Sequence, residues 1–223
     1  MRTTKVIFFF PYCLTIFFLF PFSGRAQSLT AAAFFQDENI PAVYLGIDFT
    51  KAKLIHDENS KADIIQGKQF NGINDLMIKE SKKYDFKGAY RRTNWTTDIS
   101  EVEKRNQFAD PDFLKSSNDS DLHWFKKPDV DTLVSRFNFG DLKGYGILLI
   151  VEGMDKPKRI MTVWYTLIDV EQKKVLFSYL LQGGVIGGFG FRNYWASAIN
   201  STIIYIDNRC YPEWKERFRS NKK

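Results

Sequence analysis

Cysteine and histidine are scarce in this chain of 223 residues, which contains two of each. Cys13 and Cys210 are too few to build the disulfide framework of a small secreted domain. His56 and His123 lie in separate polar stretches without the paired spacing of a zinc site. We therefore predict no metal site and no bound cofactor.

Signatures of catalysis and of nucleotide binding are also missing. No serine occupies a G-x-S-x-G elbow,. Gly188 is followed by Phe189 and Gly190, whereas a Walker loop needs a lysine and a hydroxyl residue there,. Asn193 stands where a dinucleotide-binding fingerprint needs its third glycine,. The sequence therefore predicts no catalytic residue.

The first 26 residues follow the order of a secretory signal peptide,. Arg2 and Lys5 are followed by an uncharged apolar stretch over 6–22 and by small residues up to Ala26. Cleavage after Ala26 would leave Gln27 as the new N-terminus. The signal peptide predicts export to the periplasm or the extracellular space.

An uncleaved membrane anchor is the alternative interpretation of this segment. The apolar stretch is about 17 residues long, at the short limit for crossing a bilayer,. Pro11 and Pro21 interrupt it, and proline disrupts a helix interior,. These features favour cleavage, after which we expect no membrane span.

Loss of the signal peptide lowers the formal net charge from +6 to +3, because Arg2, Lys5 and Arg25 leave without any acidic residue. A surface of mixed charge gives little support to nucleic-acid binding. Cys210 then remains alone and cannot form an internal disulfide. Its aromatic neighbours favour burial, with pairing between two chains as the alternative.

The chain beyond the signal peptide is long enough for one domain,. We expect a variable lead-in over 27–41, a single α/β domain over 42–209 and a basic, frayed tail over 210–223.

Hydrophobic periodicity predicts strands and helices in a mixed order. The predicted strands cover 42–49, 89–97, 146–152, 159–169 and 174–182. The predicted helices cover 70–83, 129–139 and 193–206, with a helical turn over 99–108 and an exposed loop over 110–127. Short polar connectors between the last three strands indicate an antiparallel meander. We predict an α/β (α+β) two-layer sandwich, in which helices pack on one face of a mixed sheet.

The glycine-rich bend over 183–190 is the most unusual feature of the sequence. One interpretation is structural: glycines allow a sharp turn and close approach of the last helix. A second is a partner-binding loop, and a third is anion binding at the helix N-terminus. The structural-turn residues are Gly183, Gly184, Gly187, Gly188 and Gly190, and the partner-contact residues are Phe189, Phe191 and Arg192.

Two carboxylates near the first predicted strand, Asp48 and Asp63, lack an identifiable partner. We interpret them as solvated or capping groups rather than as acid–base catalysts. The cations Lys156, Lys158 and Arg159 are interpreted as a charged hairpin tip.

The run GGFGFRNYWA over 187–196 resembles a motif of a family of uncharacterised secreted proteins from Gram-negative bacteria. The resemblance covers about residues 42–206, and the family carries no activity to transfer. The order of elements more distantly resembles the periplasmic α/β module of the curli-secretion lipoprotein and of the penicillin-binding-protein activator lipoproteins. Those proteins carry a lipobox cysteine, which this chain lacks.

The resemblance and the predicted export together favour a non-enzymatic envelope module that binds or assembles another protein. The alternative is a small-ligand-binding or hydrolytic domain with a pocket near residues 183–190. Homo-oligomer formation stays open.

Overall fold

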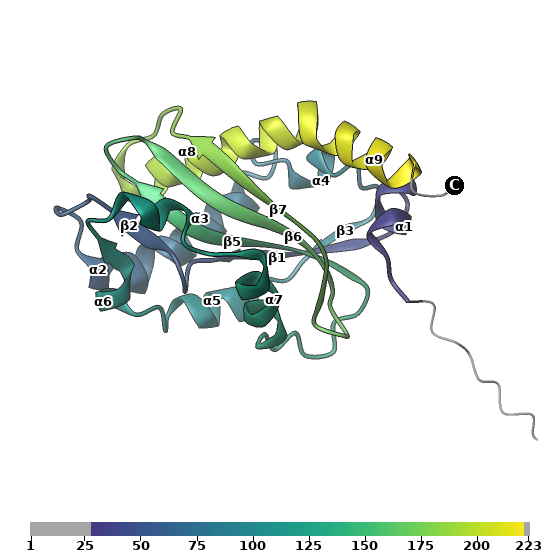
Figure 1. Cartoon of the computed structure of the whole chain (residues 1–223), viewed down its shortest axis with the longest axis horizontal. Helices are drawn as coiled ribbons and strands as arrows, with labels where there is room; N and C mark the ends of the chain where they lie inside the picture. The colour runs from purple at the N-terminus through teal and green to yellow at the C-terminus, as the bar shows by residue number, and fades with distance from the viewer. Residues whose placement is uncertain (1–27, 221–223) are drawn as a thin grey trace, which may run out of the picture.

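The computed structural model describes residues 28–220, so the predicted signal peptide lies outside the described residues. One seven-stranded sheet runs through the molecule, with helices above and below it (Figure 1). The strands are β1 (Ala42–Asp48), β2 (Lys53–Ile55), β3 (Trp95–Thr97), β4 (Lys115–Ser116), β5 (Tyr145–Asp155), β6 (Ile160–Asp169) and β7 (Lys174–Gly184). The helices are α1 (Ala31–Gln36), α2 (Ala62–Ile64), α3 (Phe70–Lys79), α4 (Phe86–Ala89), α5 (Ser100–Asn106), α6 (Pro111–Leu114), α7 (Lys127–Ser135), α8 (Gly190–Tyr205) and α9 (Tyr211–Ser220). Short 3₁₀ and π-helical segments complete the chain as η1 (Ile65–Gln69), η2 (Asp119–His123) and η3 (Ile206–Cys210).

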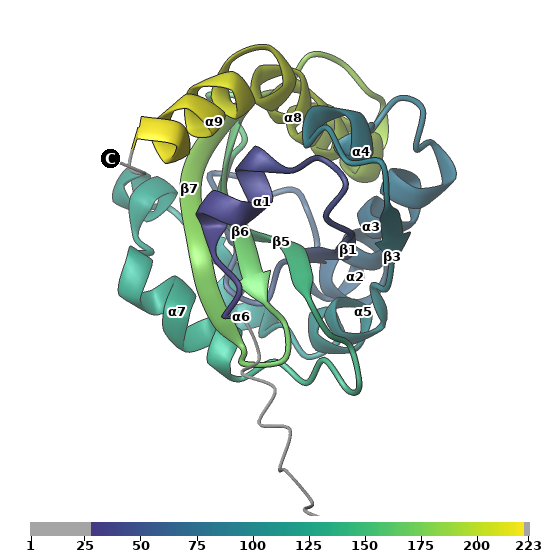
Figure 2. The same cartoon turned by 90° about the vertical axis from the view of Figure 1, so that its right-hand side faces the viewer.

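The sheet is built around β5. Along one side, β6 pairs with β5 over its whole length, and β7 pairs with β6; both pairings are antiparallel. Along the other side, β1 and then β2 pair with β5 in parallel, one after the other. The short strands β3 and β4 extend the sheet in parallel beyond β1 and β2. The predicted mixed α/β class is therefore confirmed, and the sheet curves strongly from β7 to β3 (Figure 2).

Both faces of the sheet are covered, so the prediction of helices on one face is wrong. Thr162 and Tyr165 lie three residues apart on β6, and their side chains therefore point to opposite faces. The Tyr165 hydroxyl forms a hydrogen bond with Thr202 of α8. On the other face, the Thr162 hydroxyl donates to the Leu122 carbonyl of η2 at 2.6 Å. All eleven residues of β5 are buried, which requires cover on both sides,.

The cover on this second face comes partly from 110–127, which was predicted to be an exposed loop. Leu114, Leu122 and Phe125 are buried there. The polar residues between them form turns and caps; Asn118, for example, accepts the Ser120 amide at 3.1 Å. The polar composition of this segment therefore led to a prediction of exposure, although three of its apolar side chains are buried.

The free edge of β1 is closed by side-chain amides. Beyond Tyr44, no strand that the structure describes pairs with β1 on its β3 side. There Asn74 of α3 accepts the Ile47 amide at 2.7 Å and donates to the Ile47 carbonyl at 2.9 Å. Asn106 of α5 accepts the Phe49 amide at 2.8 Å. These two asparagines replace a neighbouring strand and satisfy buried backbone groups.

The ends of the described chain pack together on the core. Phe35 of α1 is fully buried, and its ring stacks on Phe218 of α9 with centroids 5.2 Å apart. Trp214 of α9 is also buried, and the centroids of the Trp214 and Phe35 rings lie 5.7 Å apart. The expected lead-in therefore contains a core helix, and the predicted frayed tail is wrong for residues 211–220, which form α9. The prediction rested on the cations of α9 and overlooked its apolar stripe, which is formed by Tyr211, Trp214 and Phe218.

Candidate functional site

The glycine-rich loop connects the end of β7 to the start of α8, and its tip is apolar and exposed. Phe189 is 94% exposed and Ile186 is 61% exposed. Single exposed apolar side chains are common, but two large ones in one short loop can mark a contact with another molecule. The loop tip is therefore a candidate contact surface.

Of the three predicted contact residues, the structure brings two to the surface. Phe189 and Arg192 are exposed. Phe191 is half-buried and packs edge-on against Trp195, with ring centroids 6.3 Å apart. Phe189 and Arg192 are thus available to a partner, whereas Phe191 anchors the first turn of α8 to the core.

Four of the predicted turn glycines have a demonstrable structural reason. Gly187 and Gly190 have φ values of +157° and +74°, which residues with a side chain rarely adopt,. A Cβ atom on Gly183 would lie 2.2 Å from the Ala198 carbonyl oxygen, so only glycine lets β7 and α8 approach this closely,. Gly188 has φ +101°, and its Cβ would lie 2.4 Å from the Asn193 carbonyl oxygen. A Cβ on Gly184 would meet nothing within 4 Å, so packing does not require glycine there.

The tip of the β5–β6 hairpin lies beside this loop. The Val185 amide donates to the Arg159 carbonyl at 2.8 Å. The Lys156 ammonium lies 3.9 Å from the centroid of the Tyr194 ring on α8. Lys158 forms an ion pair at 3.0 Å with Asp155. Sequence reasoning treated the hairpin cations and the loop separately, and the pairing of β6 with β7 is what brings them together.

A shallow pocket of about 380 Å³ separates the loop from α3 and η1. Its lining includes two cations, Lys68 and Arg192, and the exposed Phe189. The Arg192 side chain extends over Gly72, where a Cβ atom would lie 3.1 Å from the Arg192 Cδ atom. The lining contains no carboxylate among the residues that the structure describes, so the pocket beside Phe189 carries positive charge.

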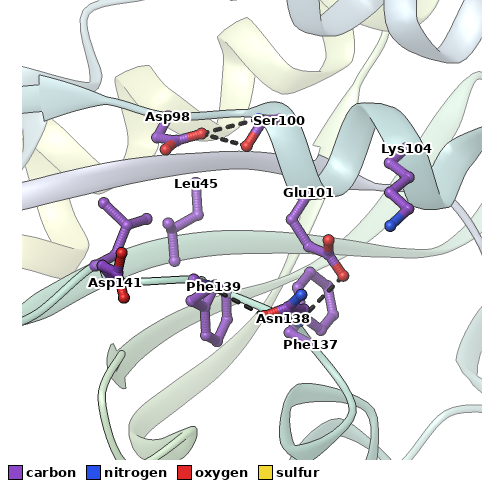
Figure 3. A pocket seen from close by; sticks show the side chains of 11 residues that line it. Leu45, Asp98, Ser100, Glu101, Lys104, Phe137, Asn138, Phe139 and Asp141 are labelled. Carbon is purple, nitrogen blue, oxygen red and sulfur yellow. Dashed lines mark hydrogen bonds between the residues drawn. The ribbon is translucent and has the colours of Figure 1, made fainter.

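Another pocket lies at the opposite end of the sheet, next to the start of β5, and Figure 3 shows its lining. It measures about 530 Å³, and its floor is apolar, with Leu45, Phe137 and Phe139. Its rim carries Asp98 and Glu101, both engaged: Asp98 accepts the Ser100 amide at 3.0 Å, and Glu101 accepts the Asn138 amide at 3.1 Å (Figure 3). These carboxylates fix the turns around the pocket.

Asp48 has the partner that the sequence did not reveal. Its carboxylate is fully buried, and it forms an ion pair with the Arg105 Nε atom at 2.7 Å. It also accepts the Thr50 amide at 2.8 Å. The interpretation of Asp48 as solvated is wrong, although it does cap the turn after β1. Asp63, by contrast, is exposed as expected.

The two histidines are exposed and lie far apart in the sequence. His56 pairs with Asp119 at 2.5 Å, and His123 lies in η2. Within residues 28–220, no group of three or more potential metal-ligating side chains occurs.

Glu152 is a buried acid that sequence reasoning overlooked. Its side chain is fully buried on β5, and its Oε1 atom accepts the Phe125 amide at 2.6 Å. Burial raises the pKa of Glu152 to about 7, although the bond from Phe125 opposes that shift,. The available signal was a single glutamate at the end of the apolar run GILLIVE.

Cys210 is buried, as predicted, and carries a free thiol. Burial raises its pKa to about 11,.

No family model matches this chain, and no curated protein matches it. Among residues 28–220, no helix combines the length and the apolar character needed to cross a bilayer,.

Proposed function

We propose that this protein is an exported, non-enzymatic module that binds another envelope protein through the tip of its glycine-rich loop. The observation that carries the proposal is the 94% exposure of Phe189 beside the exposed Arg192. Aromatic and arginine side chains dominate the binding energy of protein interfaces. The resemblance of residues 187–196 to a family of secreted proteins supports only the exported part of this proposal.

The antiparallel meander β5–β7, with α8 packed on it, is the rigid unit that we propose presents the loop. Gly183 anchors the loop at one end, and Phe191 anchors it at the other. A loop held at both ends loses little conformational freedom when its tip is buried, which favours binding.

The test is photocrosslinking in the native envelope. A photoreactive amino acid replaces Phe189, and cross-linked proteins are identified by mass spectrometry. A matched control places the same group at Tyr205, which is 51% exposed on α8. The expected result is one envelope protein that crosslinks from position 189 and not from position 205.

Binding of the purified partner then measures the contribution of each side chain. Burying a phenylalanine is worth about 2 kcal/mol, so Phe189→Ala should weaken binding about thirtyfold. The double variant Phe189→Ala/Arg192→Ala should weaken it further, while Tyr205→Ala/Arg209→Ala should not. Equal affinities for both double variants would refute the assignment of the loop.

A second candidate function is small-ligand binding, or hydrolysis, in the pocket beside the loop. The observation that favours it is the cavity of about 380 Å³ with Lys68 and Arg192 in its lining. A bound molecule that survives purification, and that is lost from Lys68→Ala, would support this function. If the photoreactive group at position 189 crosslinks a protein and no small molecule copurifies, the result would argue against ligand binding.

Export has its own test. The proposal expects the protein isolated from cells to begin at Gln27. Recovery of a chain that retains residues 1–26 in the membrane fraction would instead support the anchor.

A further inference from the structure

A third pocket, separate from the glycine-rich loop, lies between the end of β1 and the start of β2. The chain leaves β5 after Asp48 and rejoins it at Lys53, and this break opens a pocket of about 400 Å³. Helices α5, α6 and α7 lie on the same side of the sheet around it (Figure 1). Its lining consists of Thr50, Lys51, Arg105, Phe108, Asp110, Phe113, Leu133 and Arg136. Ligands of α/β sheets commonly bind just beyond the carboxyl end of a parallel strand. Thr50 and Lys51 lie at such a position, just after β1.

Arg105 is held in place before any ligand arrives. Its Nε atom donates to the buried Asp48 at 2.7 Å, and its guanidinium lies 4.0 Å from the centroid of the Phe137 ring. Its side chain keeps 19% of its surface exposed. A second nitrogen of the guanidinium donates to the Thr50 hydroxyl at 3.4 Å. Because two nitrogens are engaged and the plane of the group is fixed, the remaining donors have a defined direction.

The pocket also holds positive charge without a counter-ion. Lys51 and Arg136 line it, and neither forms an ion pair with any residue between 28 and 220. Asp110 is the one carboxylate among the described lining residues, and it already accepts the Asp112 amide at 2.9 Å as the cap of α6. Even with Asp48 counted against Arg105, the site keeps an excess of positive charge.

Aromatic surface stands next to these cations. Phe108 is 79% exposed at the rim, second only to Phe189 among the large apolar side chains described as exposed. Phe113 forms part of the wall, where the Lys51 ammonium lies 5.3 Å from the centroid of its ring. An exposed phenylalanine costs hydration free energy unless a flat apolar group covers it.

We propose that this pocket binds a small organic anion that carries an aromatic ring, of the class of aromatic phosphate monoesters. The phosphate group lies against Arg105, Arg136 and Lys51, and the ring packs on Phe108. Two features favour this class: three cationic side chains line the pocket and can donate hydrogen bonds to phosphate oxygens, and the exposed ring of Phe108 favours an aromatic substituent,.

Titration calorimetry with four defined probes tests the proposal. Phenyl phosphate carries both features, inorganic phosphate lacks the ring, phenol lacks the charge, and benzoate carries a single negative charge. We expect phenyl phosphate to bind about tenfold more tightly than each of the other three.

Variants at exposed positions locate the binding. Arg136→Gln and Phe108→Ala should each weaken phenyl phosphate binding about fivefold. Lys104→Gln, an exposed lysine of the pocket in Figure 3, should leave it unchanged. Circular dichroism spectra that match the wild type confirm that each variant is folded.

Three outcomes would overturn the proposal. They are the absence of phenyl phosphate binding at millimolar concentration, an affinity no greater than that of inorganic phosphate, and equal effects of Lys104→Gln and Arg136→Gln. Each is independent of the loop, so the protein-binding proposal stands or falls separately.

Discussion

Replacing Glu152 by glutamine should make the protein more stable at alkaline pH and should leave it nearly unchanged at acidic pH. Glu152 is fully buried, and its Oε2 atom makes no hydrogen bond of normal geometry with a described residue, although the Trp164 indole opposes part of the rise in pKa. Its pKa in the folded protein is raised to about 7 from an ordinary value of 4.5, chiefly by burial. The charged form is therefore the one that the fold tolerates poorly.

The sign of the pH dependence follows from proton binding. Between pH 4.5 and about 7, the folded protein keeps a proton on Glu152 that the unfolded chain has released. Stability therefore falls as the pH rises through this window, and the loss is complete above it. An elevation from 4.5 to about 7 corresponds to about 3 kcal/mol,.

Glutamine reproduces the neutral acid but not the charged one. At pH 5, both side chains are neutral, both can accept the Phe125 amide, and both leave one polar group without a partner. Their stabilities should then agree within about 1 kcal/mol. At pH 8, the variant should exceed the wild type by about 3 kcal/mol.

Urea denaturation followed by tryptophan fluorescence measures both free energies of unfolding. The informative quantity is the difference between variant and wild type at each pH, because other titrating groups cancel from it. Glu58→Gln, at an exposed position, serves as the control and should show no such difference. A difference between Glu152→Gln and wild type that stays constant from pH 5 to pH 8 would refute the reasoning.

Three further predictions follow from packing and hydrogen bonding. Gly183→Ala should destabilise the protein by about 1–3 kcal/mol in urea denaturation, because its Cβ meets backbone, whereas Gly184→Ala should stay within about 0.5 kcal/mol. Asn74→Ala should cost about 2–4 kcal/mol, since it leaves a buried amide and carbonyl of β1 unpaired, while Asn138→Ala at an exposed turn should cost under about 1 kcal/mol. The Cys210 thiol should resist alkylation at pH 8 in the folded protein, where about one thiol in a thousand is ionised, and should react quickly once urea unfolds the chain.

The elements with strong local patterns were predictable. The strands over 42–49 and 146–152 appear as β1 and β5, and the predicted strands over 159–169 and 174–182 appear as β6 and β7. Each is long and apolar enough for its own residues to determine its conformation. The buried face of the helix predicted over 193–206 was also correct, because its apolar residues recur at helical spacing: Trp195, Ile199, Thr202 and Ile203 of α8 and Ile206 of η3 are all buried.

Short elements were predicted poorly, because tertiary contacts decide them. The strand expected over 89–97 shrinks to β3, and α4 precedes it. β2 and β4 are three and two residues long and exist because they pair in succession beside β5. No local pattern distinguishes such segments from loops.

The candidate sites show the same division between local and distant information. The glycine-rich bend identified Phe189 and Arg192 as candidate contact residues, but it left open whether they are exposed, and the structure shows that they are. The anion pocket was not foreseeable, because it depends on Asp48 reaching Arg105 across 57 residues of chain. At the end of a strand, a carboxylate without a neighbour in the sequence looks solvated. Once buried, that same carboxylate must find a cation, and the cation it fixes then faces a pocket. A buried, paired acid is therefore a useful marker: it identifies the arginine whose orientation the fold has already determined, and with it the place to look for a ligand.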